Sequence, residues 1–317
     1  MDKKEVVMAK KHSFIKLLTA TGFAMFLANK YIDNKSNNKN KVHSTGEFFN
    51  YKYGEVYYNK FGSGDPILLI HDLNAMSSSY EWEEIIDDLS ENHTVYTIDL
   101  LGCGQSAKPN IIYTNFLYVE MLKDFIKSVV KEKAIIITSH NSGSIGVMIN
   151  HMHPELVKKV ILINPNDLEN NSFITTQKDK LLKKCIYLPL LGTSIYNSAY
   201  TEENIKKVLR ETYFYNKELG NKYFDLYYQV AHYNESKSRY LYASIRCKYT
   251  NIDIANGIND KDNIIIIESS ERYNAPRICE VYQKKNSEIK IETLDNSKLL
   301  PQLETPGALI ELLNKEL

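Results

Sequence analysis

The sequence predicts an α/β fold: a mostly parallel, twisted sheet with helices on both faces and an inserted helical cap. From residue 47 onward, β-rich runs alternate with helical patterns, as expected where crossover helices join parallel strands. Several runs are continuously apolar, which strands buried on both faces require. One segment, at about 167–258, breaks the alternation, is helical and Tyr-rich, and is therefore interpreted as the cap.

The first segment, residues 1–32, combines basic residues with an apolar run. Four lysines within the first eleven residues precede LLTATGFAMFLAN at 17–29. As a helix this run rises roughly 20 Å, short of the ~30 Å hydrocarbon core of a bilayer, although flanking lysines can snorkel and extend it. We expect an uncleaved membrane anchor, with a cleaved signal or an amphipathic surface helix as alternatives. The N-terminal lysines slightly favour an extracytoplasmic main domain.

A polar stretch rich in Asn and Lys, residues 33–46, is expected to be a linker. The main domain then spans 47–317. Its expected strands are 55–62, 66–72, 94–100, 134–139, 159–164, 263–269 and 288–294, and its expected helices outside the cap are 78–91, 115–132 and 144–156. The aromatic residues of the cap are expected to pack between the cap and the sheet.

Composition limits the classes of partner. Lys plus Arg and Asp plus Glu number 39 each, so no net positive field favours nucleic acid. The four cysteines are widely spaced without a CxxC pair, and the histidines do not cluster. Neither a metal site nor a disulfide framework is therefore indicated, buried thiols are expected, and no cofactor is expected.

Four motifs follow one another along the main domain. They are LLIHDLNAMSSSYEW at 68–82, TIDLLGCGQSAKPN at 97–110, SHNSGS at 139–144 and LLPQLETP at 299–306. In this order they are similar to an oxyanion loop, a Gly-rich turn, a nucleophile elbow and the tail segment that carries a catalytic histidine. From about residue 47 to its end, the chain thus resembles the α/β-hydrolase superfamily.

The resemblance implies a nucleophile, a histidine and a carboxylate. The nucleophile position falls on Asn141, whose amide cannot act as a serine does but which tolerates the strained backbone of an elbow. The histidine position falls on Leu299, and no histidine follows His232. The acid position falls on Glu271, with Asp167 at an alternative location. The triad implied by the resemblance is therefore degenerate.

The expected oxyanion loop contains His71, Asp72 and Leu73, with Ser142 supplying a second backbone donor. Asp72 stands where the family has glycine. Its negative charge near a developing oxyanion would oppose stabilisation by the backbone donors. Alternatively, its side chain points away and holds the loop through Asx-type hydrogen bonds. The sequence leaves both arrangements open.

The sequence favours a non-hydrolytic, membrane-tethered protein that binds a small apolar or ester-like molecule, or a protein partner. One alternative is an active ester or amide hydrolase with a rearranged site. Its nucleophile would be Ser139 or Ser142, and its base His140 or His232. A third hypothesis, an interaction platform, predicts a pocket plugged by cap aromatics, among them Tyr213, Phe214 and Tyr227.

Overall fold

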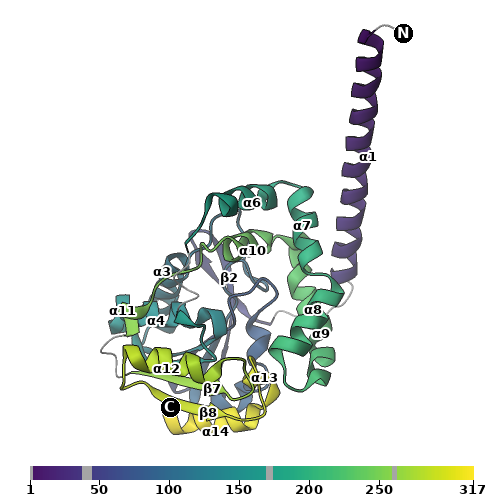
Figure 1. The fold of residues 1–317 in the computed structure, drawn as a ribbon. Coiled ribbons are helices and arrows are strands. Elements are labelled where there is room, and N and C mark those ends of the chain that lie inside the picture. The colour runs from purple at the N-terminus through teal and green to yellow at the C-terminus, as the bar shows by residue number, and fades with distance from the viewer. Residues whose placement is uncertain (1–2, 38–44, 169–173, 259–262) are drawn as a thin grey trace.

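The computed structural model describes residues 3–37, 45–168, 174–258 and 263–317. Its strands form one sheet in the order β1-β2-β4-β3-β5-β6-β7-β8 (Figure 1). β2 pairs antiparallel with β1 and β4, and the other neighbours pair in parallel. The predicted mostly parallel sheet is confirmed. The strands are β1 Glu47–Tyr51, β2 Gly54–Phe61, β3 Asp65–Ile70, β4 His93–Ile98, β5 Ala134–Ser139, β6 Val157–Ile163, β7 Ile264–Ser269 and β8 Lys290–Leu294.

All seven predicted strands form, and β1 is an addition that the sequence analysis missed. β1 lies at the edge of the sheet and pairs with β2 from Glu47 opposite Tyr58 to Tyr51 opposite Gly54. Four of its five residues are exposed or only partly buried. It therefore lacks the continuous apolar run that marks the inner strands.

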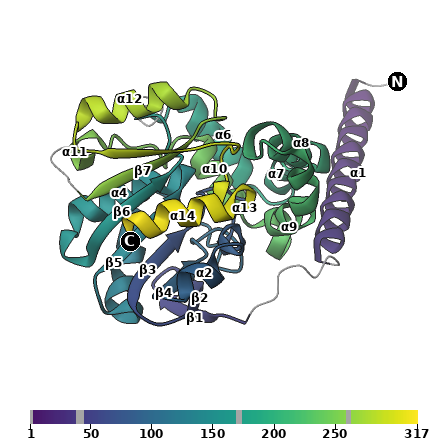
Figure 2. The same cartoon turned by 90° about the horizontal axis from the view of Figure 1, so that it is seen from below.

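Side-chain alternation along the strands separates two cores. Leu68 and Ile70 of β3 belong to the core on one face, and Ile67 and Leu69 belong to the core on the other. α3, α4 and α12 cover the first face, and α2 and α14 cover the second (Figure 2). The bounds of the helices outside the cap are η1 Ser79–Trp82, α2 Ile86–Ser90, α3 Asn115–Phe125, η2 Ile126–Val130, η3 His140–Ser142, α4 Gly143–Met152, η4 Pro154–Leu156, α12 Ala275–Lys285, α13 Pro301–Glu304 and α14 Pro306–Glu316.

The predicted cap is helical. Its elements are α6 Gln177–Tyr187, α7 Leu191–Ala199, α8 Glu202–Val208, η5 Leu209–Tyr213, α9 Lys217–Ser236 and α10 Arg239–Arg246. A core of cap aromatics packs directly on Leu299, Leu300 and Leu303 of the main domain. The last helix of the predicted interval, α11 Ala255–Ile258, contacts α4 and α12 instead. All four cysteines are free thiols, of which Cys103 and Cys247 are buried.

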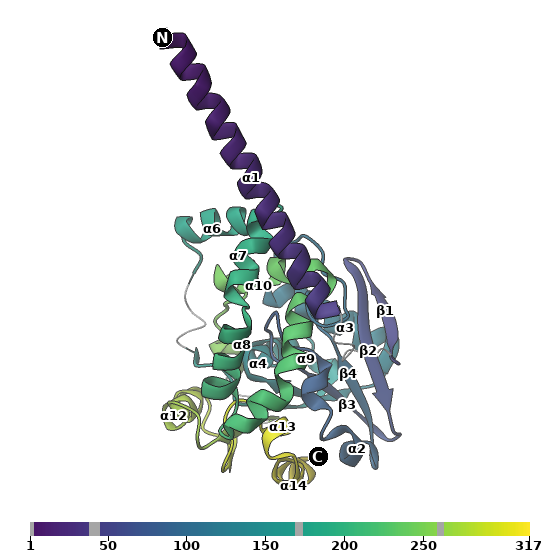
Figure 3. The ribbon, with the colours of Figure 1, turned by 90° about the vertical axis from the view of Figure 1, so that its right-hand side faces the viewer.

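The N-terminal helix α1, Lys3–Asn37, extends away from the body, and its C-terminal end lies against α7 and α9 (Figure 3). Within the described residues, no helix has the length and apolarity needed to cross a membrane, so the predicted spanning anchor is not supported. The apolar run at 17–29 is too short, and Asn29 instead donates to the carbonyl of Leu190 at 3.2 Å. The helix continues through 33–37, the first residues of the predicted linker, while 38–44 lie outside the described residues.

Candidate functional site

The turn between β5 and α4 carries a left-handed backbone at His140, where φ is +44°. The sequence analysis expected the strained residue at Asn141, and this expectation is wrong by one residue. β5 stays paired with β6 up to Ser139, which lies opposite Ile163. The chain must therefore reverse at the very next position. α4 then begins at Gly143.

The carboxylate of Asp72 points into this turn. Its Oδ1 accepts the backbone N–H of Asn141 at 3.0 Å and the side-chain amide of the same residue at 2.8 Å. Its Oδ2 accepts the hydroxyl of Tyr213 at 3.2 Å. Asp72 is only 1% exposed. Of the two arrangements that the sequence left open, the structure has the one in which the negative charge faces the elbow.

The neighbours of Asp72 in the loop are also buried. His71 lies beneath the loop, where its Nε2 accepts the N–H of Leu100 at 3.0 Å and its Nδ1 is 2.7 Å from the Asp72 carbonyl. This arrangement requires the neutral tautomer with the proton on Nδ1, and burial lowers the pKa of His71. Leu73 is 3% exposed. His71 therefore supports the loop from inside.

A second carboxylate, Glu81, lies beside the first. Its Oε2 accepts the backbone N–H of Asp72 at 2.9 Å, and its Oε1 accepts the hydroxyl of Tyr227 at 3.1 Å. Burial, together with the charge of Asp72, raises the pKa of Glu81 to about 8. At neutral pH, Glu81 is therefore mainly protonated, which avoids two adjacent buried negative charges.

The Glu81→Gln substitution is expected to flatten the pH dependence of stability. Between about pH 4.5 and 8 the folded state holds the Glu81 proton and the unfolded state has released it, so the free energy of unfolding falls as pH rises. The contribution is at most about 1.4 kcal/mol per pH unit. Urea titrations of wild type and Glu81→Gln at pH 5 and pH 8 measure how the free energy of unfolding changes with pH. The matched control is Glu132→Gln, since Glu132 is exposed. Equal slopes for Glu81→Gln and wild type would contradict the assignment.

The tail segment brings Leu299 to the elbow by way of Asn164, the residue that follows β6. The Asn164 amide donates to the carbonyls of Lys298 at 2.8 Å and Leu299 at 3.2 Å. The side-chain oxygen Oδ1 of Asn164 accepts the backbone N–H of Ser269 at 2.8 Å. The backbone carbonyl oxygen of Asn164 lies 3.0 Å from Nδ1 of His140. Asn164 thus ties β6, β7, the tail and the elbow together, and Leu299 is buried against the cap.

The loop after β7 turns Arg272 inward rather than Glu271. Glu271 is exposed, whereas Arg272 donates from Nη1 to both carboxylate oxygens of Glu268, at 3.0 and 3.2 Å. Burial lowers the pKa of His140, the negative charge of Asp72 opposes this, and the positive charge of Arg272 adds a smaller lowering. The alternative acid, Asp167, pairs with Arg277 at 3.2 Å. The loop therefore directs a cation, not a carboxylate, toward the elbow.

The candidate serines are held by other groups. Ser142 donates its hydroxyl to the backbone carbonyl of Ser139 at 2.7 Å, and Ser139 accepts the amide of Gln302 at 3.3 Å. Both serines are completely buried. His232 lies in the cap, with Nε2 on the Tyr200 carbonyl at 2.9 Å. Among the hydrogen bonds of the described residues, neither serine pairs with a histidine.

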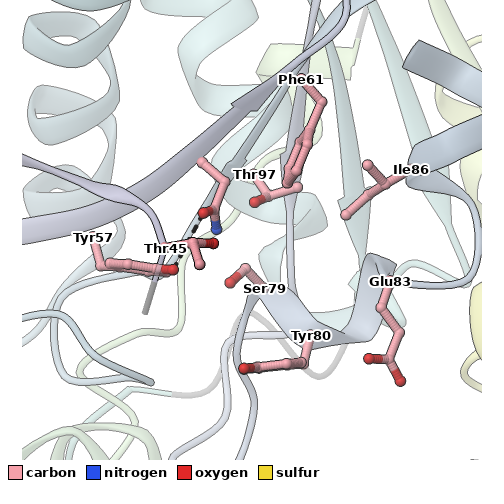
Figure 4. A pocket seen from close by; sticks show the side chains of 9 residues that line it. Thr45, Tyr57, Phe61, Ser79, Tyr80, Glu83, Ile86 and Thr97 are labelled. Atoms are coloured by element: carbon pink, nitrogen blue, oxygen red, sulfur yellow. Dashed lines mark hydrogen bonds between the residues drawn. The ribbon is translucent and has the colours of Figure 1, made fainter. Parts of the chain in front are cut away.

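A small cavity lies between the cap and the elbow loop. A cavity lined by Met76, Glu81, Tyr227 and Leu303, among others, has a volume of about 10 Å³, room for at most about one water molecule. A larger hollow of about 180 Å³ lies between strands β2 and β4 on one side and the segment that starts at Ser79 on the other (Figure 4). Its lining residues are Thr45, Tyr57, Asn59, Phe61, Ser79, Tyr80, Glu83, Ile86 and Thr97.

Sequence reasoning missed Glu81, Asn164 and Arg272 as residues of this site. Glu81 lies within the motif at 68–82, Asn164 ends the expected strand 159–164, and Arg272 directly follows the predicted acid Glu271. Their roles depend on which way the side chains turn, which spacing alone does not reveal. Tyr213 was predicted as part of a plug, and its contact with Asp72 spans 141 positions of sequence.

Comparisons with known proteins extend these observations. A sequence model of the family described as "alpha/beta hydrolase fold" matches residues 27–184. The 2-hydroxy-6-oxo-6-(2'-aminophenyl)hexa-2,4-dienoic acid hydrolase of Metapseudomonas resinovorans is 34% identical over 111 residues, which are 34% of this chain and 38% of that protein. A cis-3-alkyl-4-alkyloxetan-2-one decarboxylase of Shewanella oneidensis is 26% identical over 114 residues, 35% of each chain.

The solved structures resemble this chain over a longer range. A serine hydrolase involved in carbazole degradation has a TM-score of 0.68 at 18% sequence identity, covering 86% of this chain and 98% of its own. This likeness shows the fold. The curated relatives match over little more than a third of their own lengths.

Proposed function

Because this chain belongs to the α/β-hydrolase superfamily, we propose that it retains the scaffold of the family, lacks its serine-hydrolase reaction, and acts by binding. The observation that carries the proposal is the carboxylate of Asp72 on the backbone N–H of Asn141, at 3.0 Å. In a working elbow, a backbone N–H of this turn would serve the oxyanion of the transition state. Here a carboxylate of the protein itself holds that donor.

The other catalytic positions support the same proposal. His140 has the left-handed backbone of the turn, and in this proposal it takes the place of the nucleophile. Leu299 takes the place of the base, and Arg272 replaces the acid near the elbow. Loss of a single triad member already lowers the rate by orders of magnitude. The loss of several members together therefore favours a non-hydrolytic protein over a hydrolase that uses an unusual nucleophile.

The buried cap aromatics favour binding through the surface. Tyr213, Phe214 and Tyr227 are each at most 4% exposed, and the hydroxyls of Tyr213 and Tyr227 bond to Asp72 and Glu81. An apolar ligand entering between cap and sheet would have to displace these contacts. The proposal therefore assigns binding to the outer surface, with a protein partner as the expected class.

A fluorophosphonate probe, which reacts with activated serines, tests the proposal directly. The full chain is expected to remain unlabelled and to cleave a short-chain aryl ester no faster than buffer, while an established serine hydrolase is labelled in parallel. Circular dichroism verifies that the unlabelled protein is folded. Labelling that disappears in Ser139→Ala or Ser142→Ala would instead establish the rearranged hydrolase.

A further inference from the structure

The outer side of β1 pairs with no strand in the part of the chain that the structure describes, and β1 forms one edge of the sheet (Figure 3). Two carbonyl groups of β2 identify the residues of β1 that face outward. The carbonyl oxygen of Tyr57 accepts the N–H of Asp99 at 2.9 Å. The carbonyl oxygen of Glu55 accepts the N–H of Ala107 at 2.8 Å. Both carbonyls therefore point away from β1.

The register of the two strands then fixes the outward groups of β1. Phe48 lies opposite Tyr57, and Asn50 lies opposite Glu55. Residues directly opposite each other in an antiparallel pair turn their backbone groups either both inward or both outward. Phe48 and Asn50 therefore direct their N–H and C=O groups away from β2, where they offer a template for a further strand.

β1 carries none of the features that usually protect an edge strand. Sheet edges are commonly blocked by proline, by charged side chains or by a bulge. The sequence of β1 is EFFNY, in which Glu47 is the one charged residue, and its register with β2 is continuous. The opposite edge strand, β8, instead carries an ion pair between Lys290 and Glu292 at 2.9 Å. β1 is therefore the edge that is open to pairing.

Exposed apolar side chains flank this edge on both faces of the sheet. Phe49 packs on Phe125, with ring centroids 5.6 Å apart. Phe48 therefore points to the other face, where it packs on Tyr57 and is 47% exposed. On the face of Phe49 an open groove of about 550 Å³ runs beside the end of β1. Its exposed apolar lining residues include Tyr53, Ile112 and Phe116. Apolar patches of this kind mark protein interfaces.

We propose that β1 pairs with β1 of a second copy of this chain, antiparallel about a two-fold axis at Phe49. The outward residues Phe48 and Asn50 lie on either side of Phe49, so this axis places Phe48 of each copy opposite Asn50 of the other. Each of these two pairs exchanges two backbone hydrogen bonds, and all the outward groups of both residues gain partners. Such self-complementarity is what an interface between identical copies requires, and it favours a second copy over a foreign strand.

Sedimentation equilibrium of the full chain over a range of concentrations tests the inference. We expect a reversible dimer with twice the 36.6 kDa mass of one chain. Asn50→Pro removes an outward N–H, which an edge strand tolerates, and leaves the bonds between β1 and β2 in place. It is expected to raise the dissociation constant of the dimer at least about tenfold, because the symmetry makes one substitution remove two hydrogen bonds. Asn50→Ala, which keeps the N–H, is the matched control and should leave the dissociation constant unchanged.

A cysteine at the axis tests the register. Phe49→Cys places two thiols across a non-hydrogen-bonded pair, whose Cα atoms lie about 4.5 Å apart, within reach of a disulfide. Oxidation is expected to give a covalent dimer that a reductant separates. In Asn50→Cys, the offset of two residues along the strands puts the Cα atoms roughly 8 Å apart, beyond that reach. Wild type, with its four native cysteines, controls for other cross-links.

Three results would each overturn the inference. They are a monomer at every concentration, a folded Asn50→Pro variant that dimerises as wild type does, and cross-linking of Asn50→Cys in preference to Phe49→Cys. Circular dichroism verifies that each variant is folded. None of these results bears on labelling by a fluorophosphonate, so failure here leaves the proposal for the elbow intact.

Discussion

In a background of Asp72→Gly and Leu299→His, the change His140→Ser is expected to create a serine that reacts with a fluorophosphonate, whereas Asn141→Ser in the same background is not. The left-handed backbone at His140 places that residue, and not its neighbour, at the apex of the turn. Removing the Asp72 carboxylate frees the Asn141 N–H to stabilise an oxyanion. Leu299→His supplies a base from the tail segment.

The measurement is the rate of labelling of the two variants at equal concentration, with circular dichroism to verify the fold. We expect at least about a hundredfold difference, the usual scale of a positioned acid–base group. Labelling of Asn141→Ser alone would show that residue 141, and not residue 140, occupies the apex of the turn. If neither folded variant is labelled by the fluorophosphonate, the view that the rest of the scaffold can still support a serine-hydrolase reaction is contradicted.

The change Asn164→Gly is expected to lower the free energy of unfolding by about 3–5 kcal/mol. The Asn164 side chain bonds to Ser269, Lys298 and Leu299, and all of these contacts are buried or partly buried. Losing them leaves buried donors and acceptors without partners, at about 1–3 kcal/mol each. Glycine is chosen because φ at this position is +49°, which alanine would adopt only with strain.

Urea denaturation measures this loss. The matched control is Asn204→Gly, because the exposed Asn204 amide also donates to two backbone carbonyls, those of Ser198 and Ala199 at 3.2 Å. Water replaces these bonds after the change, so the loss there is limited mainly to about 0.3–0.5 kcal/mol of helix propensity, the difference between asparagine and glycine. Similar losses for the two variants would mean that Asn164 does not tie the strand ends together.

Apolar patterning was sufficient to predict the sheet, because inner strands such as β3 and β7 must be apolar on both faces. It failed for β1, which lies at an edge and is held by its register with β2. At the N-terminus the apolar run of 13 residues predicted a membrane segment, which the structure does not support, because no helix within the described residues is long and apolar enough to cross a membrane.

The candidate site was predictable in place but not in detail. The order of the motifs located the elbow, whereas the apex depends on how far β5 stays paired with β6, a property of two strands and not of one. Glu271 and Arg272 are adjacent, and the choice between them follows from the carboxylate of Glu268 that receives Arg272. Tertiary partners therefore decide what the local sequence leaves open.

The projecting helix α1 also affects how the molecule moves through water. Its 35 residues form a rod roughly 50 Å long, and only the C-terminal end lies on the cap. A compact body of about 270 residues has a radius of gyration of roughly 18 Å, so the rod extends well beyond it. Viscous drag on such a shape exceeds the drag on a sphere of equal mass. A single copy therefore diffuses and tumbles like a considerably heavier globular particle.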